Sequence, residues 1–206
     1  LSEVKHEDRI NELEFDFNMN EFDAISVANV VGETEVRINT ELFKIKGVMN
    51  GKMDLFFRHN GKYYILDWKS NFLGFTLDDY QKANVEEAMT DSNYHLQYLI
   101  YTMASRLYLK NRIPDFNYDD HFGGVVYLFL RGIRNIDNSG GIFTNKPTVD
   151  VLNRGHVHGG GIRAQTHADG EGHGRQEMGG VVFFVDHLVA YQSPAGRLGD
   201  FDVQAL

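Results

Sequence analysis

Alternating hydrophobic and polar residues mark the first strands that the sequence predicts. Residues 12–17 read Glu-Leu-Glu-Phe-Asp-Phe, which has the two-residue period of a half-buried strand. Residues 42–46 predict another short strand. Two further β-rich runs, 51–59 and 62–69, are separated only by Asn-Gly, a dipeptide that accepts the positive φ values of a tight hairpin turn. The first part of the chain should therefore form β-structure that includes one hairpin.

After the hairpin the sequence predicts two helices and then two further strands. Thr76 and Asp79 have the spacing of a capping box, so one helix should run from Thr76 to about residue 89, and a second should follow over about 94–110. Residues 123–131 are almost continuously apolar, as in a central buried strand, and residues 142–144 suit an edge strand. The predicted fold class is α/β, a mixed β-sheet flanked by helices.

The hairpin has a definite register if its turn holds two residues. His59 then pairs with Lys62, and the other pairs follow along both strands. One face becomes wholly apolar, with Met53, Leu55 and Phe57 opposite Trp68, Leu66 and Tyr64. On the other face Asp54 lies opposite Asp67, and Lys69 lies two residues further along the same side.

The acidic pair on this hairpin suggests a metal site. Opposed carboxylates, with Cβ atoms roughly 5 Å apart, repel each other unless something neutralises them. Oxygen-rich sites suit Mg²⁺, Mn²⁺ or Ca²⁺, which can polarise a phosphoryl oxygen and activate a water. Lys69 could orient that water or stabilise developing charge. An exposed strand face whose acids keep the protein soluble explains the same spacing equally well.

The composition changes after about residue 150. Residues 155–180 hold nine Gly and four His with little apolar periodicity, so we expect disorder there. The histidines could bind nickel or zinc, although a solvated tail is the simpler explanation. Residues 181–185 resemble a strand without an evident place in the fold. The sequence thus predicts two parts, a folded domain over 1–150 and a low-complexity tail over 151–206.

Composition and charge narrow the possible functions. The 206-residue chain has no cysteine, which excludes disulfides, zinc ribbons and iron–sulfur clusters. It shows no run of 18 apolar residues and no signal peptide, so we expect a cytoplasmic protein without membrane segments. Its net charge of −9 argues against a module that grips DNA phosphates by itself, but not against a nuclease that binds cations. The first residue, Leu1, suggests a segment of a longer polypeptide.

Several segments of the chain resemble a known family. GKMD at 51–54 and DWK at 67–69 resemble the GxxD…DxK signature of the PD-(D/E)xK nuclease superfamily. The longer segments GVMNGKMDLFFRHNGKYYILDWKSNFLG, HLQYLIYTMASRLYL, HFGGVVYLFLRGI and GIFTNKP resemble the C-terminal nuclease domain of the RecB family. The resemblance covers about residues 9–148 and implies a restriction-endonuclease-like fold that hydrolyses DNA.

The resemblance also implies roles for individual residues. Asp54, Asp67 and the backbone carbonyl of Trp68 would hold the metal, and Lys69 would assist hydrolysis. In the family a glutamate on an upstream strand belongs to the same site. Glu12 matches it, with Glu14 on the same strand as the alternative.

The QxxxY motif of the family corresponds to Gln97 and Tyr101. Their i, i+4 spacing puts both on one face of the second predicted helix, turned towards the site and the DNA strand. Without the resemblance, ordinary helix packing would explain the pair, since other tyrosines lie nearby.

Two family features are unmatched in the sequence. A histidine from an earlier helix completes the metal site of the family, and His6 lies too close to Glu12 to supply it, so the site here would be incomplete. The family domain also ends with a short helix after the GIFTNKP-like segment, and here we expect the Gly/His-rich tail in its place.

Together these features predict a Mg²⁺-dependent exodeoxyribonuclease domain of a RecBCD-type helicase–nuclease in recombinational repair of double-strand breaks. The expected partners are single strands of unwound DNA, RecC-like and RecD-like subunits, and a RecA-type recombinase. The alternative is a catalytically impaired nuclease fragment that serves as a docking module for these subunits or for the recombinase.

Overall fold

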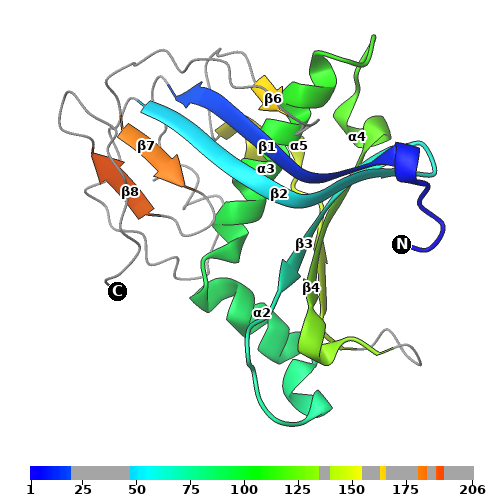
Figure 1. The fold of residues 1–206 in the computed structure, drawn as a ribbon, viewed down its shortest axis with the longest axis vertical. Coiled ribbons are helices and arrows are strands. Elements are labelled where there is room, and N and C mark those ends of the chain that lie inside the picture. The colour runs from blue at the N-terminus through cyan, green and yellow to red at the C-terminus, as the bar shows by residue number, and fades with distance from the viewer. Residues whose placement is uncertain (20–46, 135–139, 155–162, 166–180, 185–188, 193–206) are drawn as a thin grey trace.

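A mixed β-sheet forms the centre of the fold (Figure 1). The computed structural model describes residues 1–19, 47–134, 140–154, 163–165, 181–184 and 189–192. Its strands are β1 (Arg9–Met19), β2 (Gly47–His59), β3 (Lys62–Lys69), β4 (Phe122–Phe129), β5 (Ile142–Asn145), β6 (Arg163–Gln165), β7 (Val181–Phe184) and β8 (Val189–Gln192). They follow the order β5-β4-β3-β2-β1-β6, with β7 beside β2 and β8 beside β7. The β3–β4 and β2–β7 pairs are parallel and the others antiparallel.

Helices and short helical turns connect and flank these strands. They are η1 (His6–Asp8), η3 (Leu77–Tyr80), α2 (Lys82–Asp91), α3 (Tyr94–Lys110), α4 (Tyr118–His121), η4 (Leu130–Gly132) and α5 (Val149–Arg154). The predicted α/β class, a mixed sheet flanked by helices, is confirmed. Among the described residues, no helix is both long enough and apolar enough to span a membrane.

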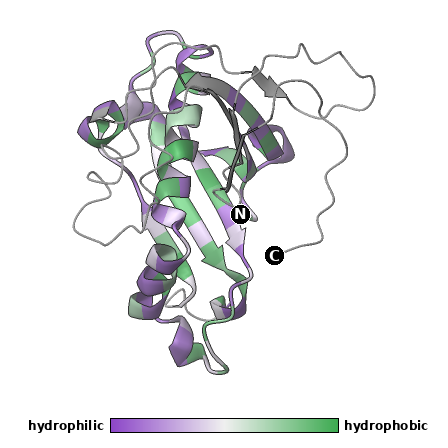
Figure 2. Cartoon of the chain, turned by 90° about the vertical axis from the view of Figure 1, so that its left-hand side faces the viewer, coloured by the Kyte–Doolittle hydropathy of each residue, from purple (hydrophilic) through white to green (hydrophobic). Residues whose placement is uncertain are grey.

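The main core lies between α3 and one face of the sheet. Figure 2 shows hydrophobic residues of α3 against hydrophobic positions of the strands behind it. The predicted helix over about 94–110 is confirmed, and so is the buried strand, since alternate residues of β4 are 0–1% exposed. The core side chains include Leu99, Ile100 and Met103 of α3 with Phe56, Ile65, Val125 and Tyr127 of the strands.

The predicted hairpin register is confirmed near its turn. The ladder runs from His59↔Lys62 to Leu55↔Leu66, and Asn60 and Gly61 have φ values of 50° and 79°. Leu55 and Leu66 belong to a second, smaller apolar cluster on the opposite side of the sheet from α3.

The prediction that Met53 faces Trp68 on this apolar side is wrong. Met53 belongs to the main core, where its sulfur accepts a 3.6 Å hydrogen bond from Ser105 of α3, whereas Trp68 is 39% exposed. The reason lies in β1, where Glu12 has a left-handed backbone with φ of 54°. A strict two-residue alternation cannot continue through such a residue, so β1 and its partner β2 change faces there together.

The predicted helix from Thr76 to about residue 89 is divided in two. Its capping box is confirmed, since Asp79 accepts hydrogen bonds from the Thr76 amide and hydroxyl at 2.7 and 2.8 Å. The turn that follows is only η3, and Gln81 is extended, with ψ of 162°, before α2 begins. The interruption lets Tyr80 turn its side chain into the core, where it is 2% exposed.

The short helix α5 corrects another expectation. It follows the GIFTNKP segment directly, so the prediction that the tail replaces this helix is wrong. Leu152 is 4% exposed within the main core, and Arg106 of α3 donates a 2.9 Å hydrogen bond to Asn153. The predicted boundary at residue 150 therefore falls inside a packed helix.

Parts of the predicted tail are strands. The predicted strand at 181–185 is confirmed as β7, and β6 lies within the stretch that was expected to be disordered. The other residues of 155–180, with their four histidines, lie outside the described residues, as does the strand predicted at 42–46.

We expect Leu152→Ala to lower the free energy of unfolding by about 2–5 kcal/mol, because it leaves a cavity in a packed core. Chemical denaturation followed by circular dichroism measures the change. The exposed helical variant Lys110→Ala is the control and should stay within about 0.5 kcal/mol of the unmodified chain. Equal stability of Leu152→Ala and the control would contradict the packing of α5.

Candidate active site

The candidate site lies where two paired strands separate. The β2–β3 ladder ends at Leu55↔Leu66, while β2 stays paired with β1 as far as Met19↔Gly47. Asp54 is the first residue of β2 beyond that ladder. Its Oδ2 accepts a 2.8 Å hydrogen bond from the Trp68 amide. A continued ladder would pair this N–H with the backbone of β2, which has turned away from β3 at this position. The strand divergence thus places a carboxylate between β2 and β3.

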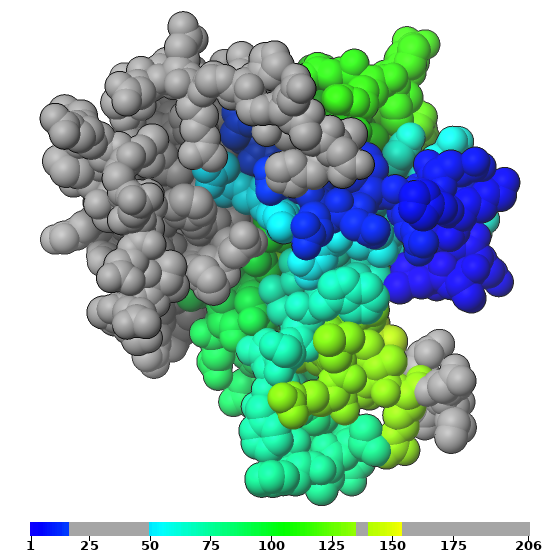
Figure 3. Space-filling model, in the orientation of Figure 1, coloured from blue at the N-terminus to red at the C-terminus, as the bar shows by residue number. Residues whose placement is uncertain are grey.

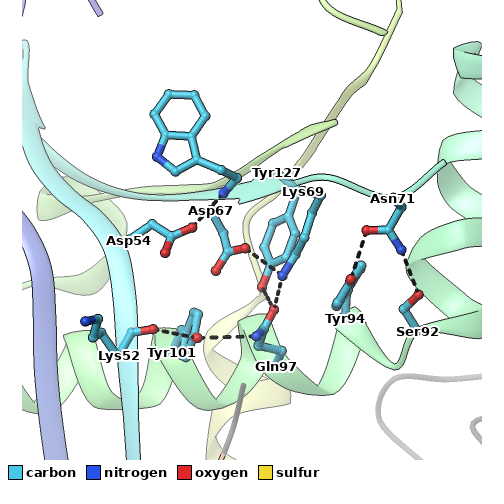
Figure 4. A network of polar contacts seen from close by, with 11 residues as sticks. Lys52, Asp54, Asp67, Lys69, Asn71, Ser92, Tyr94, Gln97, Tyr101 and Tyr127 are labelled. Atoms are coloured by element: carbon cyan, nitrogen blue, oxygen red, sulfur yellow. Dashed lines mark hydrogen bonds and ion pairs between the residues drawn. The ribbon is translucent and has the colours of Figure 1, made fainter. Parts of the chain in front are cut away.

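Asp67 and Lys69 of β3 form a buried ion pair beside Asp54. Lys69 Nζ lies 2.6 Å from Asp67 Oδ1, and the two residues are 8% and 4% exposed. Figure 4 shows the carboxyl groups of Asp54 and Asp67 close together on the α3 side of β3. The predicted convergence of these three residues is therefore found, although Asp54 stands just outside the ladder.

The amine of Lys69 has a fixed position. It donates a 2.9 Å hydrogen bond to Gln97 Oε1 and lies 3.8 Å from the centre of the Tyr94 ring. The Tyr127 ring centre is 5.0 Å from the same atom. A carboxylate, an amide oxygen and two aromatic faces all favour a cation, so they offset the cost of burying the amine.

A hydrogen-bonded chain connects α3 to both strands of the site (Figure 4). Tyr127 donates to Gln97 Oε1 at 3.0 Å, and Gln97 Nε2 donates to the Tyr101 hydroxyl at 3.3 Å. Tyr101 in turn donates to the Lys52 carbonyl at 2.7 Å. Burial, reinforced by the charge of Asp67, raises the pKa of Tyr127 well above its ordinary value, so its hydroxyl keeps the proton that it donates. Gln97 and Tyr101 thus lie at the site.

Glu12 lies near the same point of the sheet but is turned elsewhere. It stands between the pairs Asn11↔Leu55 and Leu13↔Met53 and is therefore level with Asp54. Its carboxylate pairs with Lys52 Nζ at 3.0 Å and is 65% exposed. The role predicted for Glu12, or for Glu14 as its alternative, stays a prediction.

His6 lies at the other end of β2. It precedes Arg9, whose partner is Phe57, close to the hairpin turn. The expectation that His6 does not complete the metal site stays a prediction.

The sequence of this chain is similar to that of known RecB proteins. No family model matches it. It is 39% identical over 155 residues to RecBCD enzyme subunit RecB of Haemophilus influenzae, an alignment that covers 74% of this chain and 13% of that protein. The RecB of Escherichia coli is 44% identical over 112 residues, 54% of this chain and 10% of that protein, and the RecB of Mycobacterium tuberculosis H37Rv is 35% identical over 127 residues, 55% and 12% respectively. The chain carries a RecB-related domain. It spans about an eighth or less of the length of these relatives.

The RecB-related domain has a donor set that suits a hard divalent cation. Mg²⁺ in proteins is commonly held by one or two carboxylates, with water and substrate phosphates as its other ligands. Asp54, Asp67 and the Trp68 carbonyl could supply oxygen ligands of this kind. Within the described ranges, however, no three acidic, histidine or cysteine side chains are close enough to form a metal cluster. The fit is therefore to a cation that keeps much of its water.

Two residues of this site were missed by sequence reasoning, Tyr94 and Tyr127. Tyr94 lies three residues before Gln97 and so on the same helical face, which was a usable signal. Tyr127 is level with Asp67 across the parallel β3–β4 pair. That pairing joins segments about sixty residues apart, and no local pattern reveals it.

We expect Lys69→Met to destabilise the RecB-related domain by about 3–5 kcal/mol, because it removes the cation from a buried pair. Urea denaturation with EDTA present measures the loss. The double variant Asp67→Asn with Lys69→Met should recover part of it, since the carboxylate charge is then removed too. A double variant no more stable than Lys69→Met would show that the buried pair is not the source of the loss.

Proposed function

We propose that the RecB-related domain is a Mg²⁺-dependent nuclease that hydrolyses phosphodiester bonds of DNA. The supporting observation is the buried contact between Lys69 and Asp67, 2.6 Å long, beside the carboxylate of Asp54. Burying an amine and an acid only for stability is costly, and hydrophobic residues of similar size would serve as well or better. The two acids and the amine match the signature of metal-dependent nucleases in type and spacing.

Each residue has a proposed role. Asp54, Asp67 and the Trp68 carbonyl would hold the cation, which would supply Lewis acidity at the phosphate and activate water for hydrolysis. Lys69 stabilises negative charge that develops on the scissile phosphate. Gln97 and Tyr127 position the amine of Lys69, and Tyr101 ties α3 to the β2 backbone beside Asp54. Mn²⁺ or Ca²⁺ can occupy the same oxygen ligands.

The biological setting is proposed from the relatives. The similar proteins are RecB subunits of RecBCD enzymes, so we propose that this domain acts in the cytoplasm, in DNA recombination and repair, on single strands of unwound DNA. It would assemble with RecC-like and RecD-like subunits and contact a RecA-type recombinase. The rival proposal, a catalytically impaired docking module, predicts binding of these partners without cleavage.

We expect Asp67→Ala and Lys69→Ala each to reduce cleavage at least a hundredfold, because each removes a group that contacts the metal or the reacting phosphate. The measurement is degradation of end-labelled linear single-stranded DNA with Mg²⁺, stopped by EDTA. Tyr101→Phe should be milder, since it loses only a hydroxyl, and Glu87→Ala, at an exposed position of α2, should cut normally. Normal cutting by folded Asp67→Ala would refute the assignment, and an inactive unmodified chain would favour the docking module.

Metal binding can be tested without catalysis. We expect Mg²⁺ or Mn²⁺ to raise the melting temperature of the unmodified chain, because a cation that binds the folded state stabilises it. Asp54→Asn should lose this increase, since it exchanges one ligand carboxylate for an amide. Glu14→Gln tests whether Glu14, the alternative to Glu12, contributes to metal binding. If Asp54→Asn gains as much from metal as the unmodified chain, then the metal is held by other residues.

A further inference from the structure

Two exposed phenylalanines lie in the loop that leaves the candidate active site. Residues 70–76 connect β3 to η3, and Phe72 and Phe75 are 55% and 96% exposed. Phe72 is three residues beyond Lys69 along the chain. Exposed apolar side chains that lie together mark a candidate binding surface.

The loop is held in place although its aromatic rings are exposed. Arg131 donates a 3.3 Å hydrogen bond to the Ser70 carbonyl, and the Leu73 amide donates to the Tyr80 hydroxyl at 3.2 Å. The capping box of η3 fixes Thr76 at the far end. Both ends and the middle of the loop are thus hydrogen-bonded to the fold, which presents the rings in a defined position.

The two rings support each other. Phe72 and Phe75 pack edge to face, with centroids 4.9 Å apart and an interplanar angle of 75°. The guanidinium of Arg131 lies 5.8 Å from the centre of the Phe72 ring. Phe72 therefore packs against both Phe75 and Arg131, whereas Phe75 is 96% exposed and open to a ligand.

Exposed residues of the segment that follows β4 lie beside this loop. Leu130 and Ile133 of the η4 segment are 50% and 38% exposed, and Arg131 and Arg134 beside them are also exposed. Figure 3 shows the segment around η4 next to the segment that follows β3. We name Phe72, Phe75 and Arg131 the aromatic ledge. It combines two exposed rings, which follow Lys69 by three and six residues along the chain, with a cation from the segment after β4.

We propose that the aromatic ledge binds an unpaired base of the single-stranded DNA that is cut, with Phe75 stacking on the base and Arg131 near a phosphate. The inference rests on the proposed nuclease function and identifies how the strand is held. Aromatic side chains stack on bases of any sequence, but only where the base face is exposed, as in a single strand. The ledge thus favours single strands over duplex DNA without reading sequence. A protein partner could also cover exposed apolar residues. Phe72, however, follows Lys69 by only three residues along the chain, and the ledge carries a cation.

Binding in EDTA tests the ledge without cleavage. The probe is a fluorescein-labelled oligo(dT), measured by anisotropy with the full chain. Stacking contributes about 1–3 kcal/mol per base, so Phe75→Ala should weaken binding by about 5-fold to 150-fold. Phe75→Trp should retain affinity, whereas Phe75→Leu should not, because leucine keeps apolar area but lacks an aromatic face. Leu1→Ala, an exposed apolar variant outside this surface, should bind nearly as the unmodified chain does.

A second probe separates the loss of stacking from other causes of weaker binding. An oligonucleotide of the same length built of abasic sites keeps the phosphates and lacks the bases. Phe75→Ala should bind this probe as the unmodified chain does, whereas Arg131→Gln should weaken both probes and reduce the salt dependence of binding. In cleavage assays Phe75→Ala should raise KM and leave kcat unchanged.

Failure of the ledge and failure of the nuclease proposal give different results. If the unmodified chain cuts DNA and Phe75→Ala binds oligo(dT) equally well, the ledge is refuted and the surface suits a protein partner. If Phe75→Leu binds as tightly as the unmodified chain, stacking is refuted. If neither the unmodified chain nor any variant cuts DNA, but Phe75→Trp retains affinity for oligo(dT) while Phe75→Leu and Phe75→Ala lose it, the nuclease proposal fails. The ledge then stands as a strand-binding site.

Discussion

The buried pair of Asp67 and Lys69 constrains the structure around it. Neither charge could be buried alone, because each would lose its hydration without compensation. The surrounding residues supply that compensation from two elements, with Gln97 and Tyr94 on α3 and Tyr127 on β4. The position of α3 against the sheet is thus fixed by polar contacts as well as by the apolar core. A shift of α3 would remove the amide oxygen and one ring from the amine at the same time.

The divergence of β2 from β3 is the second constraint. A regular sheet would fill the space beside Asp67 with the next residue pair of the ladder. Here β2 follows β1 away from β3, and Asp54 accepts the hydrogen bond of Trp68 that a backbone carbonyl would otherwise accept. The left-handed backbone of Glu12 lies level with this point on the neighbouring strand. The irregularity in β1 and the separation of the strands therefore occur together, at the position where the two carboxylates meet.

Local patterns predicted the parts of this arrangement that depend on nearby residues. The Asn-Gly turn set the register from His59 to Leu55, and helical spacing set the bounds of α3. The error at Met53 arose because alternation was extended through the position level with Glu12, whose backbone angle no periodicity shows. The helix α5 was missed because its buried residue, Leu152, belongs to no repeating apolar pattern. Leu152 is buried by tertiary packing against the main core.

The charge balance of the chain bears on how its proposed substrate is held. A net charge of −9 repels a polyanion, and the contacts of Lys69 are directed inwards, to Asp67 and Gln97. Electrostatic attraction by the chain alone therefore contributes little affinity for a DNA strand. Stacking on an aromatic ring does not depend on charge, and a bound cation reverses the sign of the local field only at the acids. A strand held by one stacked base and one metal-bound phosphate would be fixed at two points close along the chain, Phe75 and the acid pair. Arg131 of the ledge would add a phosphate contact beside the stacked base.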